Sequence, residues 1–139
     1  MAVKIRDVMT PNPIALPVTA LAIEAARAMR DSDIGNVVVL DGHQICGIVT
    51  DRDIVVRAVA EGLDPTSTPL MDICSRVLTT ISPEDSVDKA VRLMREKAIR
   101  RLPVVEDTRP VGIVSIGDLA LERDPKSALG NISSAPPNR

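Results

Sequence analysis

The chain contains no phenylalanine, tyrosine or tryptophan among its 139 residues, although 45% of them are hydrophobic. Any core must therefore be built from aliphatic side chains and methionine. No aromatic ring is present to stack on an unpaired base, which excludes the stacking platforms typical of single-strand binders. The formal net charge of -2 also lacks the basic excess of a nucleic-acid-binding surface. We therefore expect no nucleic-acid partner.

Histidine, cysteine and long apolar runs are also scarce. His43 is the one histidine, and it falls in a predicted turn, where a solvated side chain is the ordinary interpretation. No apolar run approaches the length of a membrane span, and the first residues show no signal-peptide pattern. We therefore expect a cytoplasmic protein with no membrane partner.

The strongest pattern in the sequence is an ungapped internal repeat with a spacing of 65 residues. Gly47-Ile48-Val49-Thr50 falls on Gly112-Ile113-Val114-Ser115, and Asp53 falls on Asp118. Each copy has only about 60 residues, which is marginal for burying enough surface alone. We therefore expect the copies to share one core. Copies packed about a pseudo-twofold axis would form two related clefts.

The repeat also gives an interpretation of the two cysteines. Cys46 aligns with Val111, and Cys74 aligns with Met9. Because each thiol stands where the other copy has an apolar residue, the repeat favours small, buried, structural cysteines. A disulfide or a metal site is the alternative interpretation.

Hydrophobic periodicity predicts the same elements in both copies. The first copy is predicted as an extended segment, a helix, a hairpin and a closing helix over 13–16, 19–30, 36–40 with 45–50, and 51–61. The second copy repeats this order over 78–81, 84–97, 102–106 with 111–115, and 116–123. This order predicts an α+β fold with small sheets packed together and helices outside. We place the copies at 1–64 and 65–124, followed by a flexible tail at 125–139.

The repeated Gly-Ile-Val-(Thr/Ser)-x-x-Asp element has two interpretations. A hydroxyl residue followed three positions later by an acid is a capping box, so Thr50 and Ser115 would cap the following helices. The same groups at a helix N-terminus could instead hold the hydroxyls of a ribose, with the helix amides favouring a phosphate. One such pair is weak support for a binding site, but two in register are stronger.

With these motifs in view, the sequence resembles a tandem pair of cystathionine-β-synthase (CBS) domains, the Bateman module. The resemblance is carried by Arg6-Asp7-Val8-Met9-Thr10, Gly-Ile-Val-Thr-Asp-Arg-Asp-Ile at 47–54, Arg100–Val105 and Gly-Ile-Val-Ser-Ile-Gly-Asp-Leu at 112–119. It covers about residues 3–124. The run that follows Thr50 is similar to small stand-alone bacterial pairs of the hypoxic-response type. The implied fold is two β-α-β-β-α repeats packed sheet to sheet about a pseudo-twofold axis.

The resemblance implies that the clefts bind adenosine derivatives, namely AMP, ADP, ATP or, in some members, S-adenosylmethionine or NAD(H). The implied ribose ligands are Thr50 with Asp53 and Ser115 with Asp118. Extended segments would meet the adenine through backbone groups, and aliphatic side chains would flank it. The segments are Ile14-Ala15 and Thr79-Thr80, and the flanking side chains are Val37 and Leu102.

The two copies differ where a phosphate would lie. The second copy has Arg100 and Arg101 where the first has Gly35 and Asn36, and the first has Arg52 where the second has Gly117. Arginine suits phosphate oxygens because its planar fork binds two of them at once. Solvated arginines are the alternative. We expect the two sites to differ in affinity, and the site of Ser115 and Asp118 is the one better supplied with arginine. Arg52 is assigned to neither cleft.

The residues show no catalytic grouping, so we expect a protein that is not an enzyme and has no obligatory cofactor. The leading hypothesis is an adenine-nucleotide sensor that signals to an unknown protein partner in trans or as a homodimer. The alternative is a ligand-free interaction module in which Thr50 and Ser115 only cap helices.

Overall fold

The structure is a computed structural model that describes residues 3–76 and 79–123. The chain divides into two compact units. Unit A is Pro13–Leu78, and unit B combines Met1–Asn12 with Thr79–Arg139. The predicted tail at 125–139 lies outside the described residues, as does Leu78.

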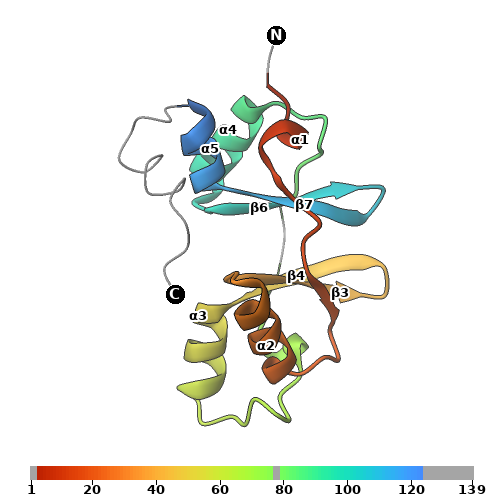
Figure 1. Ribbon diagram of the computed structural model, residues 1–139, viewed down its shortest axis with the longest axis vertical. Coiled ribbons are helices and arrows are strands. Elements are labelled where there is room, and N and C mark those ends of the chain that lie inside the picture. The colour runs from red at the N-terminus through yellow and green to blue at the C-terminus, as the bar shows by residue number, and fades with distance from the viewer. Residues whose placement is uncertain (1–2, 77–78, 124–139) are drawn as a thin grey trace. The chain divides into compact units, whose positions relative to one another are not determined.

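Unit A contains a four-stranded sheet with the strand order β2-β3-β4-β5 (Figure 1). Strand β2 runs parallel to β3, and the other neighbouring strands are antiparallel. In chain order, its elements are β2 (Ala15–Pro17), α2 (Ala22–Ser32), β3 (Asn36–Asp41), β4 (Gln44–Thr50), α3 (Asp51–Asp53), the π-helix η1 (Ile54–Val59), the 3-10 helix η2 (Leu70–Asp72) and β5 (Ser75–Arg76).

Unit B contains a three-stranded sheet with the order β1-β7-β6, in which both pairs are antiparallel. Ile81 adds a parallel bridge to Val104 of β6. The elements of unit B are α1 (Ile5–Val8), β1 (Thr10–Pro11), α4 (Val87–Lys97), β6 (Arg101–Glu106), β7 (Arg109–Ser115) and α5 (Ile116–Arg123). The predicted α+β class is confirmed. The packing of one sheet on the other stays a prediction.

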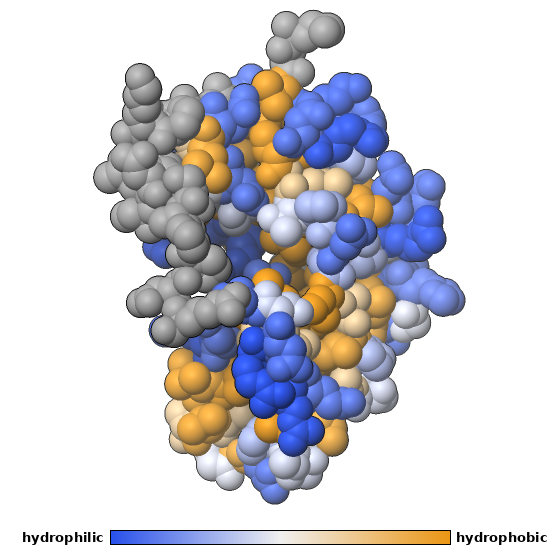
Figure 2. Space-filling view, in the orientation of Figure 1, coloured by the Kyte–Doolittle hydropathy of each residue, from blue (hydrophilic) through white to orange (hydrophobic). Residues whose placement is uncertain are grey.

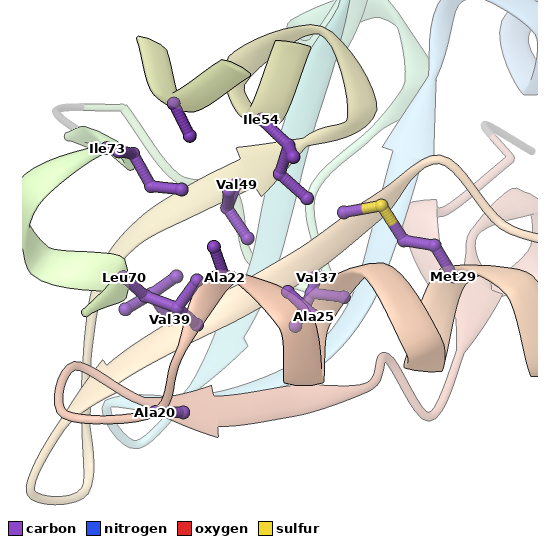
Figure 3. Packing of buried hydrophobic residues seen from close by; sticks show 11 residues of the cluster. Ala20, Ala22, Ala25, Met29, Val37, Val39, Val49, Ile54, Leu70 and Ile73 are labelled. Carbon is purple, nitrogen blue, oxygen red and sulfur yellow. The ribbon is translucent and has the colours of Figure 1, made fainter. Parts of the chain in front are cut away.

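Each unit has its own aliphatic core between its long helix and its sheet. In unit A, Ala22, Ala25 and Met29 of α2 pack toward Val37 and Val49 of the strands (Figure 3). The corresponding stripe on α4 is Val87, Ala90 and Met94, all buried. One stripe of each long helix is therefore part of a core. Small alanines let α2 lie close to its sheet, which compensates for the absence of aromatic volume.

The predicted boundary between copies, at residues 64 and 65, does not coincide with the boundaries of the compact units. Segment 3–12 belongs with the second copy, because β1 pairs with β7. Segment 63–76 belongs with the first copy, because β5 pairs with β4 and the Leu70 amide donates to the Ala20 carbonyl at 2.8 Å. The segment that leads into each copy thus packs on the other copy's unit.

The long helices begin later than predicted. Helix α2 starts at Ala22 because the Leu21 amide donates to the Glu24 carboxylate at 2.6 Å. Helix α4 starts at Val87 because the Ser86 hydroxyl accepts the Lys89 amide at 3.2 Å, so Pro83 and its acidic neighbours form the preceding turn. Both helices end in a left-handed residue, Asp33 or Ala98, at equivalent repeat positions.

The helix predicted over 51–61 is present in a different form. After the three residues of α3, it widens into η1, where the Ala60 amide donates to the Val55 carbonyl at 2.8 Å. Gly62 follows with φ 74°, as expected for a residue that ends a helix. The predicted helix over 116–123 coincides with α5. None of the helices within residues 3–76 and 79–123 has the length and apolar character needed to cross a bilayer.

Both hairpins contain a bulge that the sequence did not predict. In unit A, Val39 pairs with Gly47 and Leu40 with Ile45, which leaves Cys46 as the extra residue. In unit B, the equivalent shift leaves Val111 as the extra residue. A bulge bends its strand and interrupts the alternation of side chains. The next residue, Gly47 or Gly112, is where another segment crosses the strand closely.

Candidate functional site

Both strand-to-helix junctions form the predicted capping boxes. The Thr50 amide donates to Asp53 Oδ2 at 2.9 Å, and the Asp53 amide donates back to Thr50 Oγ1 at 3.0 Å. The corresponding distances between Ser115 and Asp118 are 2.9 and 3.2 Å. Each cap contributes about 1 kcal/mol to stability. The capping interpretation is therefore confirmed. Any binding role must use the hydrogen-bond donors and acceptors of these side chains that capping does not occupy.

In unit A, the Asp53 carboxylate has few hydrogen-bond acceptor positions left for a ligand. Its side chain is 12% exposed. Besides the bond from Thr50, the Ser75 hydroxyl lies 3.3 Å from Oδ1, and Arg57 Nε lies 3.7 Å from the same oxygen. Both carboxylate oxygens are therefore engaged within the unit. A ribose would have to displace Ser75 or Arg57 to bind here.

In unit B, the Asp118 carboxylate keeps one oxygen available. Its Oδ2 accepts the Ser115 amide, whereas Oδ1 accepts no hydrogen bond from any residue in the part of the chain that the structure describes. The residue is half-buried. The Ser115 hydroxyl accepts the Asp118 amide through its oxygen, so its own proton is free to be donated. This junction therefore offers a charged acceptor and a hydroxyl donor side by side.

Two arginines flank the same junction in unit B. Arg101 is the cross-strand partner of Ser115, and the Arg100 carbonyl accepts the Ile116 amide at 2.9 Å. Both arginines are exposed. The structure therefore brings Arg100, Arg101, Ser115 and Asp118 together, as predicted. The backbones of two arginines thus adjoin the junction that carries one carboxylate, so the net formal charge there is positive, and an anion is favoured at the N-terminus of α5.

The equivalent positions in unit A, Gly35 and Asn36, carry no charge, and an acidic residue lies beside them. Asn36 is the cross-strand partner of Thr50, and the Gly35 carbonyl accepts the Asp51 amide at 3.1 Å. The Asp51 carboxylate occupies the space beside Gly35, since a Cβ placed there would lie 3.4 Å from Asp51 Oδ2. Arg52 is exposed, and its amide donates to Asp51 Oδ1 at 2.9 Å. The carboxylates of Asp51 and Asp53 make this junction a poor place for a phosphate.

The segments predicted to be extended lie beside the first strand of each hairpin. The Ile14 carbonyl accepts the Val38 amide at 2.8 Å, and Ala15 pairs with Val38. In unit B, Ile81 forms the equivalent bridge, and Thr79 and Thr80 directly precede it. Thr80 is exposed and Thr79 half-buried. Because the bridge is parallel, their backbone groups lie toward the start of β6, the strand that begins at Arg101.

The predicted role of Val37 and Leu102 needs correction. Both side chains are 0% exposed and belong to the aliphatic cores, packed toward α2 and α4. Because neighbouring strand residues point to opposite faces, the aliphatic residues on the other face are Val38 and Pro103. Val37 and Leu102 thus lie on the core face of their strands, opposite to the face expected for contact with a ligand. Apolar residues at consecutive positions give no sign of which one faces the core.

Sequence reasoning also missed Ser75 and Arg57. Ser75 lies in the segment that crosses β4, and Arg57 lies one turn after Asp53 on η1. No motif marks either residue, because their contact with Asp53 depends on where segment 63–76 packs. The only sequence signal is the acid–base spacing of Asp53 and Arg57, four residues apart, which is common on helical surfaces.

The described residues offer no obvious metal centre. Within residues 3–76 and 79–123, no group of three His, Cys, Asp or Glu side chains is placed to hold a metal ion. Cys46 and Cys74 are both half-buried free thiols, and His43 is exposed in the β3–β4 turn.

Comparison with known proteins is consistent with this geometry. The family model for the CBS domain matches residues 5–59 and 70–123. The CBS domain-containing protein YhcV of Bacillus subtilis is 36% identical over 133 residues, which cover 93% of this chain and 94% of that protein. Hypoxic response protein 1 of Mycobacterium tuberculosis is 32% identical over 83% of this chain and 81% of its own length.

Two further similarities bear on length and ligands. An uncharacterized protein of Methanopyrus kandleri is 39% identical over 82% of this chain, which spans only 57% of that relative. Among solved structures, the CBS domain pair of protein MJ0100 has a TM-score of 0.78 and 26% identity, over 91% of this chain and 100% of that one. That structure is a complex with 5′-methylthioadenosine and S-adenosyl-L-methionine.

Proposed function

Since this chain belongs to the CBS domain family, we propose that it is a non-enzymatic cytoplasmic sensor that binds an adenine nucleotide in unit B. The single observation that carries the proposal is the combination at the start of α5: a carboxylate oxygen without a partner among the described residues, beside two exposed arginines. A nucleotide needs both features, because its ribose donates hydrogen bonds and its phosphates accept them.

In the proposed complex, Asp118 Oδ1 accepts the ribose hydroxyls, and the Ser115 hydroxyl donates to a ribose oxygen. Arg100 and Arg101 bind the phosphates. The backbone groups of Thr79 and Thr80 meet the adenine edge, since these residues precede the bridge from Ile81 to β6. The pocket needs no aromatic ring, because aliphatic side chains also cover an adenine face.

Unit A is proposed as the weaker site. Asp53 is already engaged by Ser75 and Arg57, and Asp51 adds a second negative charge beside Gly35, the repeat counterpart of Arg100. An uncharged adenosine moiety fits there better than a polyphosphate does. Thr50, Asp53, Ile14 and Ala15 remain its proposed contacts, with Arg52 available only to phosphates that extend toward solvent.

S-adenosylmethionine is the second candidate ligand, and the complex of MJ0100 supports it. Its sulfonium carries a positive charge, however, and the two arginines of unit B disfavour that charge. We therefore rank AMP and ATP above S-adenosylmethionine for unit B, and NAD(H), whose pyrophosphate also suits arginine, stays a further candidate. The ligand-free interaction module is the alternative if no nucleotide binds.

A thermal-shift and calorimetric panel of AMP, ATP, S-adenosylmethionine and NADH tests the proposal. The expected result is saturable binding and a raised Tm with AMP or ATP, because a ligand that binds only the folded state stabilises it. If none of the four ligands binds or raises Tm, the chain acts as a ligand-free module and the sensor proposal is wrong.

The arginine pair should separate phosphate binding from nucleoside binding. In the double variant Arg100→Gln, Arg101→Gln, we expect ATP affinity to fall roughly tenfold or more while adenosine affinity changes little, because only the phosphates lose charged donors. The matched control is Arg52→Gln in unit A. Calorimetric titrations of both ligands measure the effect. An equal loss of adenosine and ATP affinity would mean that the arginines do not bind phosphate.

We also propose that the protein is a homodimer that signals to a partner in trans. Unit A exposes several large apolar side chains on and after η1: Val55, Val56, Val59, Leu63 and Met71 are 57%, 43%, 60%, 44% and 53% exposed. Figure 2 shows the corresponding apolar area over the helical segment that begins with α3. A second copy is the occupant we favour, because self-association through one shared patch is the commonest closed assembly.

Light scattering after size exclusion tests this interface. The wild type is expected to elute as a dimer, and Val55→Glu with Val59→Glu is expected to weaken association by roughly a hundredfold, since each buried valine contributes about 1.5 kcal/mol or more. Lys97→Glu, an exposed charge change at the end of α4, is the matched control. A monomeric wild type, or a double variant that dimerises as well as the control, rules out this surface.

A further inference from the structure

Cys46 and Cys74 lie in two segments that cross in unit A. Strand β5 pairs with β4 through Gly47 with Arg76 and Ile48 with Ser75. A Cβ on Gly47 would lie 2.4 Å from the Ser75 carbonyl oxygen and 3.3 Å from Cys74 Sγ. Glycine at position 47, directly after Cys46, therefore lets the Cys74 thiol lie against β4.

The bulge brings the second thiol toward the same place. In a regular strand, Cys46 and Gly47 would face opposite sides of the sheet. Cys46 is instead the extra residue of the β3–β4 bulge, and a bulge interrupts this alternation. Cys46 directly precedes Gly47, the residue whose Cβ position lies 3.3 Å from Cys74 Sγ. Burial is the main factor that raises the pKa of the Cys74 thiol, and the neighbouring Cys46 side chain raises that pKa further.

Unit B has the same crossing with apolar side chains. Val111 is its bulge residue, and a Cβ on Gly112 would lie 2.5 Å from Met9 Sδ. Met9 and Val111 are the repeat counterparts of Cys74 and Cys46. The crossing is thus a packing contact in both units, and unit A replaces a thioether and an isopropyl group with two thiols. Packing alone does not need this replacement, since valine and methionine fill the position in unit B.

We propose that Cys46 and Cys74 are a reversible oxidation site whose disulfide fastens segment 70–76 to β4. The chemistry is thiol–disulfide exchange with a low-molecular-weight disulfide such as oxidised glutathione. One protein thiolate attacks the small disulfide, forms a mixed disulfide and releases one small thiolate. The second protein thiolate then attacks the protein sulfur of the mixed disulfide and releases the other. The protein gives up two electrons, the small disulfide accepts them, and the thiol protons end on the released thiols.

The bond would act next to the Thr50–Asp53 junction. Ser75, which follows Cys74, donates to Asp53, and the Cys74 carbonyl accepts Arg57 Nη1 at 3.3 Å. A disulfide holds this segment in place, so it preserves the contacts that keep Asp53 engaged. Reduction leaves the segment held only by packing and these hydrogen bonds. This consequence rests on the proposed function, whereas formation of the bond does not.

Intact mass measurement and peptide mapping after alkylation test the bond. The full chain is equilibrated with glutathione buffers of increasing oxidised fraction, in the presence of a chelator, and free thiols are then blocked with N-ethylmaleimide. The expected result is a cooperative loss of both alkylation sites within one chain, a linked peptide containing Cys46 and Cys74, and full reversal by dithiothreitol. We also expect the oxidised form to melt roughly 5 °C or more above the reduced form.

The repeat supplies matched control variants. Cys46→Val and Cys74→Met each place the unit B residue at its unit A position, and each should form only a glutathione adduct. The proposal is overturned if the wild type alkylates at both cysteines under oxidising conditions, if it forms only glutathione adducts, or if its disulfides link two chains. The wild-type mass decides this even if a variant fails to fold. Nucleotide titrations play no part in that decision, so failure here leaves the proposed function untouched.

Discussion

Asp118→Asn is expected to lower the affinity for both ATP and adenosine by roughly 10- to 100-fold. The asparagine carbonyl can still accept the Ser115 amide, so the cap on α5 is retained. What is lost is the negative charge of Asp118, the one of the two capping carboxylates that keeps an oxygen without a partner among the described residues. Because the ribose is common to both ligands, both affinities should fall together. Calorimetric titration measures the two dissociation constants.

Asp53→Asn is the matched control for this prediction. Position 53 is the repeat equivalent of position 118, and the asparagine keeps the equivalent cap. In the wild type, however, the Asp53 carboxylate is already engaged by Ser75 and Arg57. We expect its ATP affinity to stay within about twofold of the wild type. Melting temperatures without ligand show whether either variant is destabilised. Wild-type affinity in Asp118→Asn would mean that the unit B carboxylate does not hold the ribose.

Gly47→Ala is expected to cost about 2–3 kcal/mol of folding stability, near the upper part of the range for overpacking. The alanine methyl would lie 2.4 Å from the Ser75 carbonyl oxygen, which is backbone and cannot rotate away. Strand β5 must therefore shift from β4, and its pairing with Gly47 and Ile48 is lost. The φ angle of Gly47 is not positive, so the cost is steric crowding rather than backbone strain. Urea denaturation gives the free energy of unfolding.

Gly112→Ala provides the internal comparison. The nearest atom there is Met9 Sδ at 2.5 Å, at the end of a flexible side chain, while the nearest backbone oxygen is at 3.0 Å. The thioether can move, so we expect this substitution to cost about 1 kcal/mol less than Gly47→Ala. An equal cost at both glycines, or a larger cost at Gly112, would show that the close crossing in unit A is not what requires glycine at position 47.

The repeat allowed most of the local fold to be predicted. A single register placed the two helices with their Ala–Met stripes, both hairpins and both capping boxes, because these features depend on short-range spacing. The bulges and the π-helix η1 were not predicted. They arise where a second segment presses against a strand or helix, which short-range patterns do not encode. The exchange of the leading segments between units was missed for the same reason.

The candidate site was predicted in part. Arg100, Arg101, Ser115 and Asp118 do come together, because strand pairing places Arg101 opposite Ser115. Val37 and Leu102 were expected to face a ligand but face the cores. Each lies in a continuous apolar run, which does not indicate the buried face. The engagement of Asp53 depends on Ser75, a residue outside every motif. The two capping boxes are equivalent in geometry, so the difference in free carboxylate oxygens between Asp53 and Asp118 comes from tertiary packing. In the sequence, only the arginines of the second copy indicated that the two junctions differ.

Backbone amide NMR during an ATP titration tests the central claim most directly, because it reports which junction binds first. The account predicts that saturable shifts begin at residues 79–80, 100–101 and 115–118 of unit B, while residues 50–53 of unit A shift only at higher ATP concentration. Shifts that begin at residues 50–53, or no saturable shifts in either unit, would contradict it.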